Sequence, residues 1–480
     1  MRAMPRARTP SRGEDPARAS EPDTALELLG RGPFDFRWRA GRDARARTPR
    51  EALGKLPRDD RDPLAPLAAS NDGRVASLVP IRHGRMAKSP FAFYRGAAAL
   101  MAHDLARLPH SGVFVQLCGD AHLANFGLFA SPERHVLFGI NDFDETLPGP
   151  FDWDLRRLAA SFAIAARERG YGERHQRNVV ATLCTAFREK VRAATELDTL
   201  DAWYQRVTAS EVVGLAGSRE ERAKDRATVD KARRATSREW LQQGTEVVNG
   251  RLRIREAPPL TYHYPARSSR DAAKFDATVR RFFADYRTTL PDERRALFDR
   301  YRLIDTAVRV VGVGSVGTRC LVALFVADGE SPLFLQVKEA RASALEAHLP
   351  ASSYGNHGQR VVCGQRLLQS ASDIFLGWSR SIVSGFDFYV RQLRDMKGSF
   401  DVDDFSIEDL DTYARACGMA LAVSMSKAGD PATLAGYLGK SGAMDEAMQR
   451  FALAYADRNE ADYATFKAAI KAGRIQATDE

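Results

Sequence analysis

The segment CGDAHLANFG, residues 118–127, gathers residue types that can carry out chemistry. Asp120 and Asn125 lie five residues apart, with His122 between them. Protein kinases place a catalytic Asp and a metal-binding Asn at this interval, because a carboxylate orients the attacking hydroxyl while amide and carboxylate oxygens bind Mg²⁺. We therefore predict that Asp120 is the base of a phosphoryl transfer, that Asn125 binds Mg²⁺ and that His122 orders the loop.

A second acidic segment, INDFDET (residues 140–146), follows after one more predicted strand. It carries Asp142 and Asp144, and kinases hold a further metal ligand on an Asp in a similar place. Asp and Asn at strand ends also stabilise turns, and that structural role is the alternative. Because the two segments together supply several oxygen ligands, we predict that Asp142 binds Mg²⁺ and that Asp144 is a second ligand.

These two segments resemble a known pattern. GDAHLAN is similar to the G-D-x-H-x-x-N loop of the aminoglycoside and choline phosphotransferases, and INDFDET is similar to their I-D-[FW]-[DE] metal segment. The chain departs from that family at Cys118, where His is usual. The resemblance implies a protein-kinase-like fold that binds ATP and Mg²⁺ and phosphorylates a hydroxyl group of a small molecule. Asp154 in WDLRRLA matches a later Asp of the family, but we expect it to cap its helix.

A glycine-rich segment, GVGSVG, lies far along the chain. Its glycines have the G-x-G-x-x-G spacing: Gly312, Gly314 and Gly317. The residues that follow, TRCLVALFV, are strand-like, which favours a glycine-rich hairpin over a Rossmann loop, because a Rossmann loop begins a helix. FLQVKEA then carries Lys338 and is similar to the kinase strand whose Lys contacts the ATP phosphates. We predict that this segment binds ATP, with Glu339 or Glu346 as the partner of Lys338.

The two clusters occur in the reverse of the kinase order, in which the strand-rich lobe comes first. A circular permutation reconciles the orders, so we predict an α+β, bilobal, protein-kinase-like fold that is circularly permuted. Its parts are a basic, mostly disordered arm, a helical catalytic lobe, a strand-rich nucleotide-binding lobe, and C-terminal helices that return to the helical lobe. Their ranges are 1–65, 66–304, 305–400 and 401–480.

Two predicted helices compete for the position beside the catalytic loop. Residues 89–108 have helical periodicity and precede the loop directly. Residues 410–430 resemble the helix that precedes this loop in the phosphotransferases, and a permuted chain would return them to it. The sequence leaves both assignments open.

The chain as a whole resembles an uncharacterised bacterial family, domain of unknown function 2252. The resemblance rests on RMAKSPFAFYRGAA, CGDAHLANFG, NDFDE, WDLRRLA, LQVKEA and GQRLLQSASDIFLGW. This family implies no established activity, so the function has to be argued from the residues. Near the first motif, Arg82, Arg85 and Arg95 are candidates to meet a phosphate or an acidic substrate, or to pair with carboxylates.

The composition is that of a globular protein, with 44% hydrophobic and 28% charged residues. The net charge is +9, and the basic N-terminal arm leaves nucleic acid open as a partner, although its interleaved acids favour a solvated tail. The five cysteines are widely spaced, which predicts free, buried thiols in a reducing compartment. No apolar run of about 18 residues occurs, so we predict a cytoplasmic protein without a membrane span.

Other functions remain as alternatives. Asp120-x-His122 and GNHG (residues 355–358) echo metal motifs of metal-dependent phosphoesterases, which use several His and carboxylate ligands. A nucleotide-binding pseudokinase or scaffold would explain the altered loop and the missing Glu of the helix after Lys338. Transfer of a nucleotidyl group would use similar metal ligands. The acceptor substrate cannot be read from the sequence.

Overall fold

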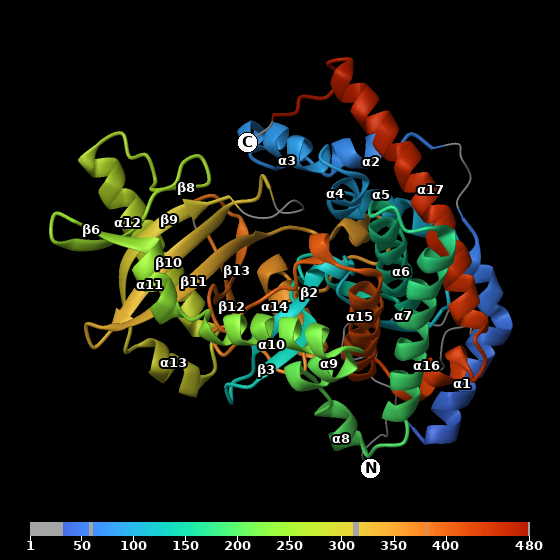
Figure 1. Cartoon of the computed structure of the whole chain (residues 1–480). Helices are drawn as coiled ribbons and strands as arrows, with labels where there is room; N and C mark the ends of the chain where they lie inside the picture. The colour runs from blue at the N-terminus through green and yellow to red at the C-terminus, as the bar shows by residue number, and fades with distance from the viewer. Residues whose placement is uncertain (1–31, 57–60, 311–315, 382, 479–480) are drawn as a thin grey trace, which may run out of the picture.

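The computed structural model describes residues 32–56, 61–310, 316–381 and 383–478. Helices and strands are mixed throughout, so the predicted α+β class is confirmed. Figure 1 shows a twisted antiparallel sheet on one side of the molecule and a body of packed helices on the other. The small strands that carry the candidate site lie between them.

The large sheet has six antiparallel strands in the order β12-β13-β11-β10-β9-β8. Their bounds are Thr261–Tyr262 (β8), Arg302–Arg309 (β9), Cys320–Ala327 (β10), Ser331–Ala340 (β11), Gly377–Arg380 (β12) and Asp387–Gln392 (β13). Side chains alternate between the two faces of a strand, so Phe334, Gln336 and Lys338 of β11 share one face. This face carries Lys338 to the helical body.

Helices cover both faces of this sheet. On one face, α12 (Ser269–Thr288) and α13 (Asp292–Phe298) bury aromatic side chains against β10, β11 and β13. On the other face, the Trp240 ring of α11 (Ser237–Gly244) meets the Phe334 ring edge-on at 4.4 Å. We predicted a helical lobe that extends to residue 304. Residues 237–304 instead pack on the sheet, because their apolar side chains are buried against it.

The helical body is built around α6 (Phe151–Glu168), which is buried along nearly its whole length. Helix α15 (Ile407–Lys427) packs against α7 (Glu173–Ala194) at very close range. A Cβ at Gly418 would lie 2.3 Å from the carbonyl oxygen of Leu183, so only glycine allows this approach. The C-terminal helices thus pack on the helical body.

Residues 34–54 differ from the prediction of a disordered arm. They form α1 (Phe34–Arg47) and the 3₁₀-helix η2 (Arg50–Gly54), and α1 packs on α16 (Pro431–Leu438). Gly41 of α1 lies against the backbone of α16, and Gly436 of α16 lies against the backbone of α1. The absence of side chains at these two positions allows the helices to pack closely.

The segment 89–108 is two helices rather than one. Helix α4 (Pro90–Gly96) ends where the Arg82 guanidinium donates a 2.7 Å hydrogen bond to the carbonyl oxygen of Gly96, and α5 (Ala98–Leu105) then begins in a new direction. Gly96 also packs against the Met86 side chain, where a Cβ would lie 2.6 Å from it. Packing on α3 (Val79–Met86) therefore overrides the helical periodicity.

The remaining elements are shorter or connect these layers. Their bounds are Leu64–Ala69 (α2), Ala76–Leu78 (η3), Val79–Met86 (α3), Phe114–Leu117 (β1), Leu123–Asn125 (η4), Phe126–Ala130 (β2), Val136–Ile140 (β3), Leu147–Pro150 (β4), Thr199–Trp203 (α8), Val207–Thr208 (β5), Ala209–Leu215 (α9), Arg219–Arg234 (α10), Thr245–Val248 (β6), Arg251–Ile254 (β7), Ala344–Ala347 (η5), His357–Leu368 (α14), Val402–Asp404 (η6) and Ala443–Lys471 (α17). All five cysteines are unpaired and four are buried, as predicted. Among the helices that the structure describes, none is long and apolar enough to cross a membrane.

Candidate active site

The loop after β1 is held by α6. Gly119 has a φ of +84°, and a Cβ there would lie 2.1 Å from the carbonyl oxygen of Glu145, so the turn requires glycine. The Asp154 carboxylate accepts hydrogen bonds from the backbone NH groups of Cys118 at 2.8 Å and Gly119 at 3.1 Å. We expected Asp154 to cap its own helix. It anchors the loop instead.

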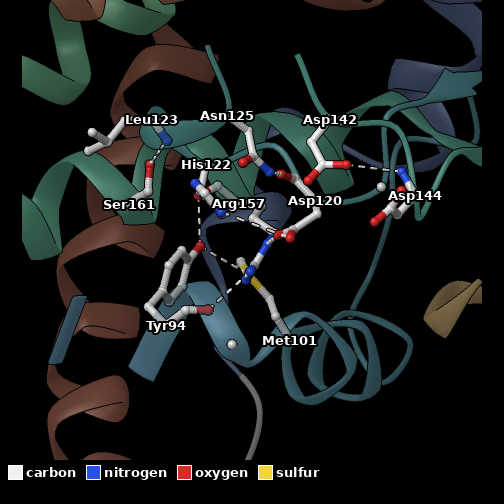
Figure 2. Close-up of polar contacts among 12 residues, drawn as sticks. Tyr94, Met101, Asp120, His122, Leu123, Asn125, Asp142, Asp144, Arg157 and Ser161 are labelled. Carbon is white, nitrogen blue, oxygen red and sulfur yellow. Dashed lines mark hydrogen bonds and ion pairs between the residues drawn. The ribbon is translucent and has the colours of Figure 1, made fainter. Parts of the chain in front are cut away.

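Asp120 emerges from this loop into a network of buried groups (Figure 2). Its Oδ1 accepts a 2.5 Å hydrogen bond from Nε of Arg157 on α6. The Arg157 guanidinium also lies 4.4 Å from the centre of the Tyr94 ring and donates to the Tyr94 carbonyl oxygen at 3.0 Å. Burial raises the pKa of Asp120 to about 6, although the Arg157 charge acts in the opposite direction. Asp120 is therefore mostly ionised at neutral pH and is matched to proton transfer there.

His122 and Asn125 complete the loop. Burial, and then the positive charge of Arg95, lower the pKa of the His122 imidazole, which is therefore neutral and lies 3.9 Å from the Asp120 carboxylate. The Asn125 side-chain NH₂ donates a 2.9 Å hydrogen bond to the Asp120 carbonyl oxygen, which fixes the orientation of the amide. The backbone NH of Asn141 donates to the Asn125 carbonyl oxygen at 2.8 Å and ties the loop to the acidic segment.

Lys338 of the large sheet reaches the acidic segment. Its ammonium group forms an ion pair with Asp144 and lies 3.8 Å from an oxygen of Asp142. Burial alone would lower the pKa of Lys338, but the two carboxylates raise it on balance, so Lys338 is charged. The pKa of Asp144 is lowered, because Lys338 and a 2.7 Å hydrogen bond from the Tyr389 hydroxyl outweigh its burial. Six predicted site residues are thus brought together from distant parts of the chain.

The sequence interpretation missed Asp144 as the partner of Lys338. We expected Glu339 or Glu346, but Lys338 pairs with the acidic segment. Glu339 points to the opposite face of β11 and accepts from the backbone NH and the guanidinium of Arg319, both at 2.9 Å. Glu346 caps η5 by accepting from the Ser343 NH at 2.9 Å. Adjacent side chains of a strand point to opposite faces of the sheet. Glu339 therefore cannot share a face with Lys338 and cannot be its partner.

Helix α14 holds the acidic segment from the side of the sheet. The buried Arg360 guanidinium donates to three carbonyl oxygens, those of Asp144 at 2.8 Å, Thr146 at 2.5 Å and Arg341 at 2.7 Å. The Gln369 amide donates to the carbonyl oxygen of Ile140 at 2.9 Å. This helix lacks a Glu, and its polar side chains bind the backbone of the acidic segment instead of the lysine.

The glycine segment joins β9 to β10, which are neighbouring antiparallel strands. Gly312 and Gly314 lie outside the described residues. Gly317 has a φ of +91°, and its carbonyl oxygen accepts a 2.8 Å hydrogen bond from the Val75 NH. Cys320 at the start of β10 is paired in register with Lys338, so the end of the glycine segment lies near this lysine.

Both helical candidates for the position beside the loop contact it. On α15, the Tyr413 hydroxyl donates to the carbonyl oxygens of Leu123 at 3.1 Å and Phe126 at 3.0 Å. The Ala428 carbonyl oxygen, directly after α15, accepts from the Gln116 NH of β1 at 3.0 Å. The segment 89–108 contributes Tyr94 through Arg157, so α15 holds the loop directly and this segment holds it through α6.

A small polar cavity of about 60 Å³ lies at this junction. Asp120, Asp142 and Asp144 line it together with Arg95. Of the arginines singled out in the sequence, both Arg82 and Arg95 line the cavity, and Arg82 also donates to Asn71 and Gly96, which is a structural role. Glu145, Arg74 and Arg82 also line the cavity, which therefore combines four carboxylates with three arginines.

The sequence interpretation also missed Arg157 and Tyr389. Arg157 lies three residues after Asp154 and directly before the mostly apolar run LAASFAIAA of α6, and a charged residue next to such a run was the available signal. Tyr389 lies on β13 and is paired in register with Lys338, a relation that only the sheet order reveals. Arg157 lies within WDLRRLA, but only Asp154 of that segment was considered, and Tyr389 lies outside the segments that carry the resemblance.

Helical body and sheet thus define an α+β protein with one acidic, lysine-containing site between them. The model of a family described as uncharacterised proteins conserved in bacteria (DUF2252) matches residues 74–469. The chain belongs to this family. No curated protein and no solved structure is significantly similar to it.

Proposed function

We propose that this chain is a Mg-ATP-dependent phosphotransferase that phosphorylates a hydroxyl group of a small molecule, with a circularly permuted, kinase-like arrangement. The observation that carries the proposal is the ion pair between Lys338 and Asp144. It joins the lysine of a β-sheet to the acidic segment that follows the Asp120 loop, although the two clusters are far apart in the sequence. Phosphoryl transfer requires a lysine, a base and metal-binding carboxylates at one point.

The order of the strands supports the kinase-like arrangement. The glycine segment joins β9 and β10, and Lys338 lies on the next strand, β11. In protein kinases a glycine-rich loop covers the phosphates and the lysine lies on the third strand. Helix α14 follows β11 and packs against the acidic segment, as the helix after the lysine does in that fold class.

The chemistry assigned to the residues is as follows. Lys338 would bind the phosphates of ATP, and Asp120 would orient the acceptor hydroxyl and accept its proton. A new bond forms between the acceptor oxygen and the γ-phosphorus, while the bond from that phosphorus to the oxygen of ADP breaks. Arg157 keeps the Asp120 carboxylate in position through its 2.5 Å hydrogen bond. ADP and the phosphorylated acceptor are the products.

Asn125, Asp142 and Asp144 fit a Mg²⁺ ion. Mg²⁺ prefers oxygen ligands and commonly takes only one or two protein carboxylates, completed by phosphates and water. When bound, the metal would neutralise charge on the transferred phosphoryl group. Within the described ranges, no group of three or more His, Cys, Asp or Glu side chains is arranged to hold a metal, which favours this assignment over a dinuclear phosphoesterase.

The test is thermal denaturation of the protein with ATP plus Mg²⁺, with Mg²⁺ alone and with Mn²⁺ alone. A ligand that binds only the folded state raises the denaturation midpoint. We expect a rise that requires nucleotide and metal together and that is lost in Lys338→Ala and Asp142→Ala. Lys274→Ala, at an exposed lysine of α12, is the matched control and should keep the rise. A rise with Mn²⁺ alone that is unaffected by Lys338→Ala would favour the phosphoesterase.

Turnover separates an enzyme from a pseudokinase. We expect slow release of ADP from Mg-ATP, with water as the acceptor, and its loss in Asp120→Ala. Release of pyrophosphate instead would indicate nucleotidyl transfer. A folded Asp120→Ala variant with unchanged turnover would contradict the role of Asp120, and binding without any turnover would indicate a scaffold.

A further inference from the structure

A second, larger cavity opens beside the candidate active site. Its volume is about 720 Å³, which is within the range of small-molecule sites. It shares Ser70, Arg74, Asp144 and Glu145 with the small cavity at Asp120, so the two adjoin. Its other walls are α5, the turn after α2 and the segment that follows β11. A ligand in the larger cavity can therefore extend toward Asp120.

Two arginines of this cavity carry charge that its acids do not neutralise. Arg74 donates to the carbonyl oxygens of Ser70 at 2.9 Å and Val316 at 2.6 Å, and Arg341 donates to the carbonyl oxygen of Asp72. In the part of the chain that the structure describes, neither guanidinium forms an ion pair with a carboxylate. The two positive charges repel each other. Burial, and then this repulsion from Arg341, lower the pKa of Arg74 to about 10.

The carboxylates of the cavity already have partners. Glu145 accepts a 2.6 Å hydrogen bond from the Ala344 NH, Glu339 accepts from Arg319, and Asp144 pairs with Lys338. Two imidazoles, His103 and His348, also line the wall, with ring centres 5.5 Å apart. The result is a cavity in which two arginines that form no ion pair within the described part of the chain lie with two further hydrogen-bonding rings.

We infer that this cavity binds the acceptor substrate and that the acceptor is a small hydroxylated phosphate monoester. The inference rests on the proposed function. A phosphate dianion matches two guanidinium charges, and arginine is the side chain best suited to phosphate oxygens. With its phosphate held at Arg74 and Arg341, such a molecule would direct a hydroxyl through the shared wall to Asp120.

The cavity is distinct from the proposed nucleotide site. Of the described residues assigned to Mg-ATP, Lys338, Asn125 and Asp142 do not line it, and Asp144 lies on the wall that the two cavities share. Phosphate in the larger cavity and Mg-ATP at Lys338 should therefore bind together. If the two arginines instead held the phosphates of ATP, the two ligands would compete.

The experiment is thermal denaturation with inorganic phosphate as the probe, with acetate at equal ionic strength as the carboxylate control. It is repeated with a non-hydrolysable ATP analogue and Mg²⁺ present. We expect phosphate, but not acetate, to raise the midpoint, with a further rise in the presence of the analogue. Arg341→Ala should weaken phosphate binding about tenfold or more, since charge-assisted hydrogen bonds are lost. Arg341→Lys should retain part of it, and Arg281→Ala, at an exposed residue of α12, should change nothing.

The outcomes separate the two proposals. Stabilisation by Mg-ATP without any by phosphate overturns the acceptor inference and leaves the phosphotransferase standing. Phosphate stabilisation that disappears when the analogue is bound also overturns it, because the arginines then belong to the nucleotide site. Stabilisation by phosphate without any by Mg-ATP contradicts the proposed function, and with it the acceptor role. An effect of acetate equal to that of phosphate would contradict the phosphate class.

Discussion

Replacing Arg157 with Gln tests whether Asp120 is a base whose ionisation controls the rate. Arg157 is the closest positive charge to Asp120, at 2.5 Å, and its side chain is only 4% exposed. The pKa of Asp120 is about 6 with this arginine present. A neighbouring opposite charge lowers a carboxyl pKa by about 1–3 units, so its removal should raise the value to about 7–9.

The rate should follow the ionised fraction of Asp120. In the native protein, activity should rise with pH through about 6, because Asp120 must lose its proton to act as a base. In Arg157→Gln this rise should move up by about 1–3 units, which reduces activity at pH 7 by about two- to ninetyfold and restores it at alkaline pH. Arg157→Lys keeps the charge and should keep much of the native profile.

The assay is the pH dependence of kcat/KM for ADP release from Mg-ATP. Arg156→Gln is the matched control, since Arg156 is the adjacent buried arginine of α6 but pairs with Asp152 at 3.6 Å and donates to Pro109 at 2.8 Å. It should leave the profile in place. Equal loss of activity at every pH in Arg157→Gln, with no shift of the profile, would refute the argument and assign Arg157 a structural role only.

Three further predictions concern the metal and the packing. Asp142→Asn should raise the Mg²⁺ concentration needed for half-maximal ADP release, whereas an unchanged requirement would remove Asp142 from the metal site. Arg360→Met should lower the free energy of unfolding by about 3 kcal/mol, measured by urea denaturation, because three carbonyl oxygens lose their donor. Gly418→Ala should cost about 1–3 kcal/mol, since the new Cβ would lie 2.3 Å from the Leu183 carbonyl oxygen. Gly214→Ala, at a helical glycine with nothing within 4 Å, should not destabilise, and equal effects at the two glycines would contradict the packing argument.

The sequence by itself determined the local elements that carry the site. The strands before Asp120 and before Asp142, the strand with Lys338 and the helix at α14 all lie where periodicity and turn residues predicted them. The spacing of Asp120 and Asn125 also predicted one loop, and η4 forms that loop. These features depend on neighbours a few residues apart, and short-range spacing is what a sequence displays directly.

Other local predictions were wrong where packing outweighed pattern. The segment 89–108 breaks at Gly96 because Arg82 takes its carbonyl oxygen, and residues 34–54 fold because their small residues fit against α16. Helices α12 and α13, which we predicted to belong to the helical lobe, pack on the sheet instead. In each case the deciding partner lies on another element, so the segment's own pattern could not reveal it.

Only the tertiary structure decided which residues meet at the site. The sequence identified Lys338 but assigned it Glu339 or Glu346, whereas the strand direction turns Glu339 away and brings Lys338 to Asp144. The contact between Arg157 and Asp120 likewise depends on how α6 packs beneath the loop. Pairings between distant residues arise from the packing of whole elements, which buries apolar faces and then requires each buried charge to find a partner.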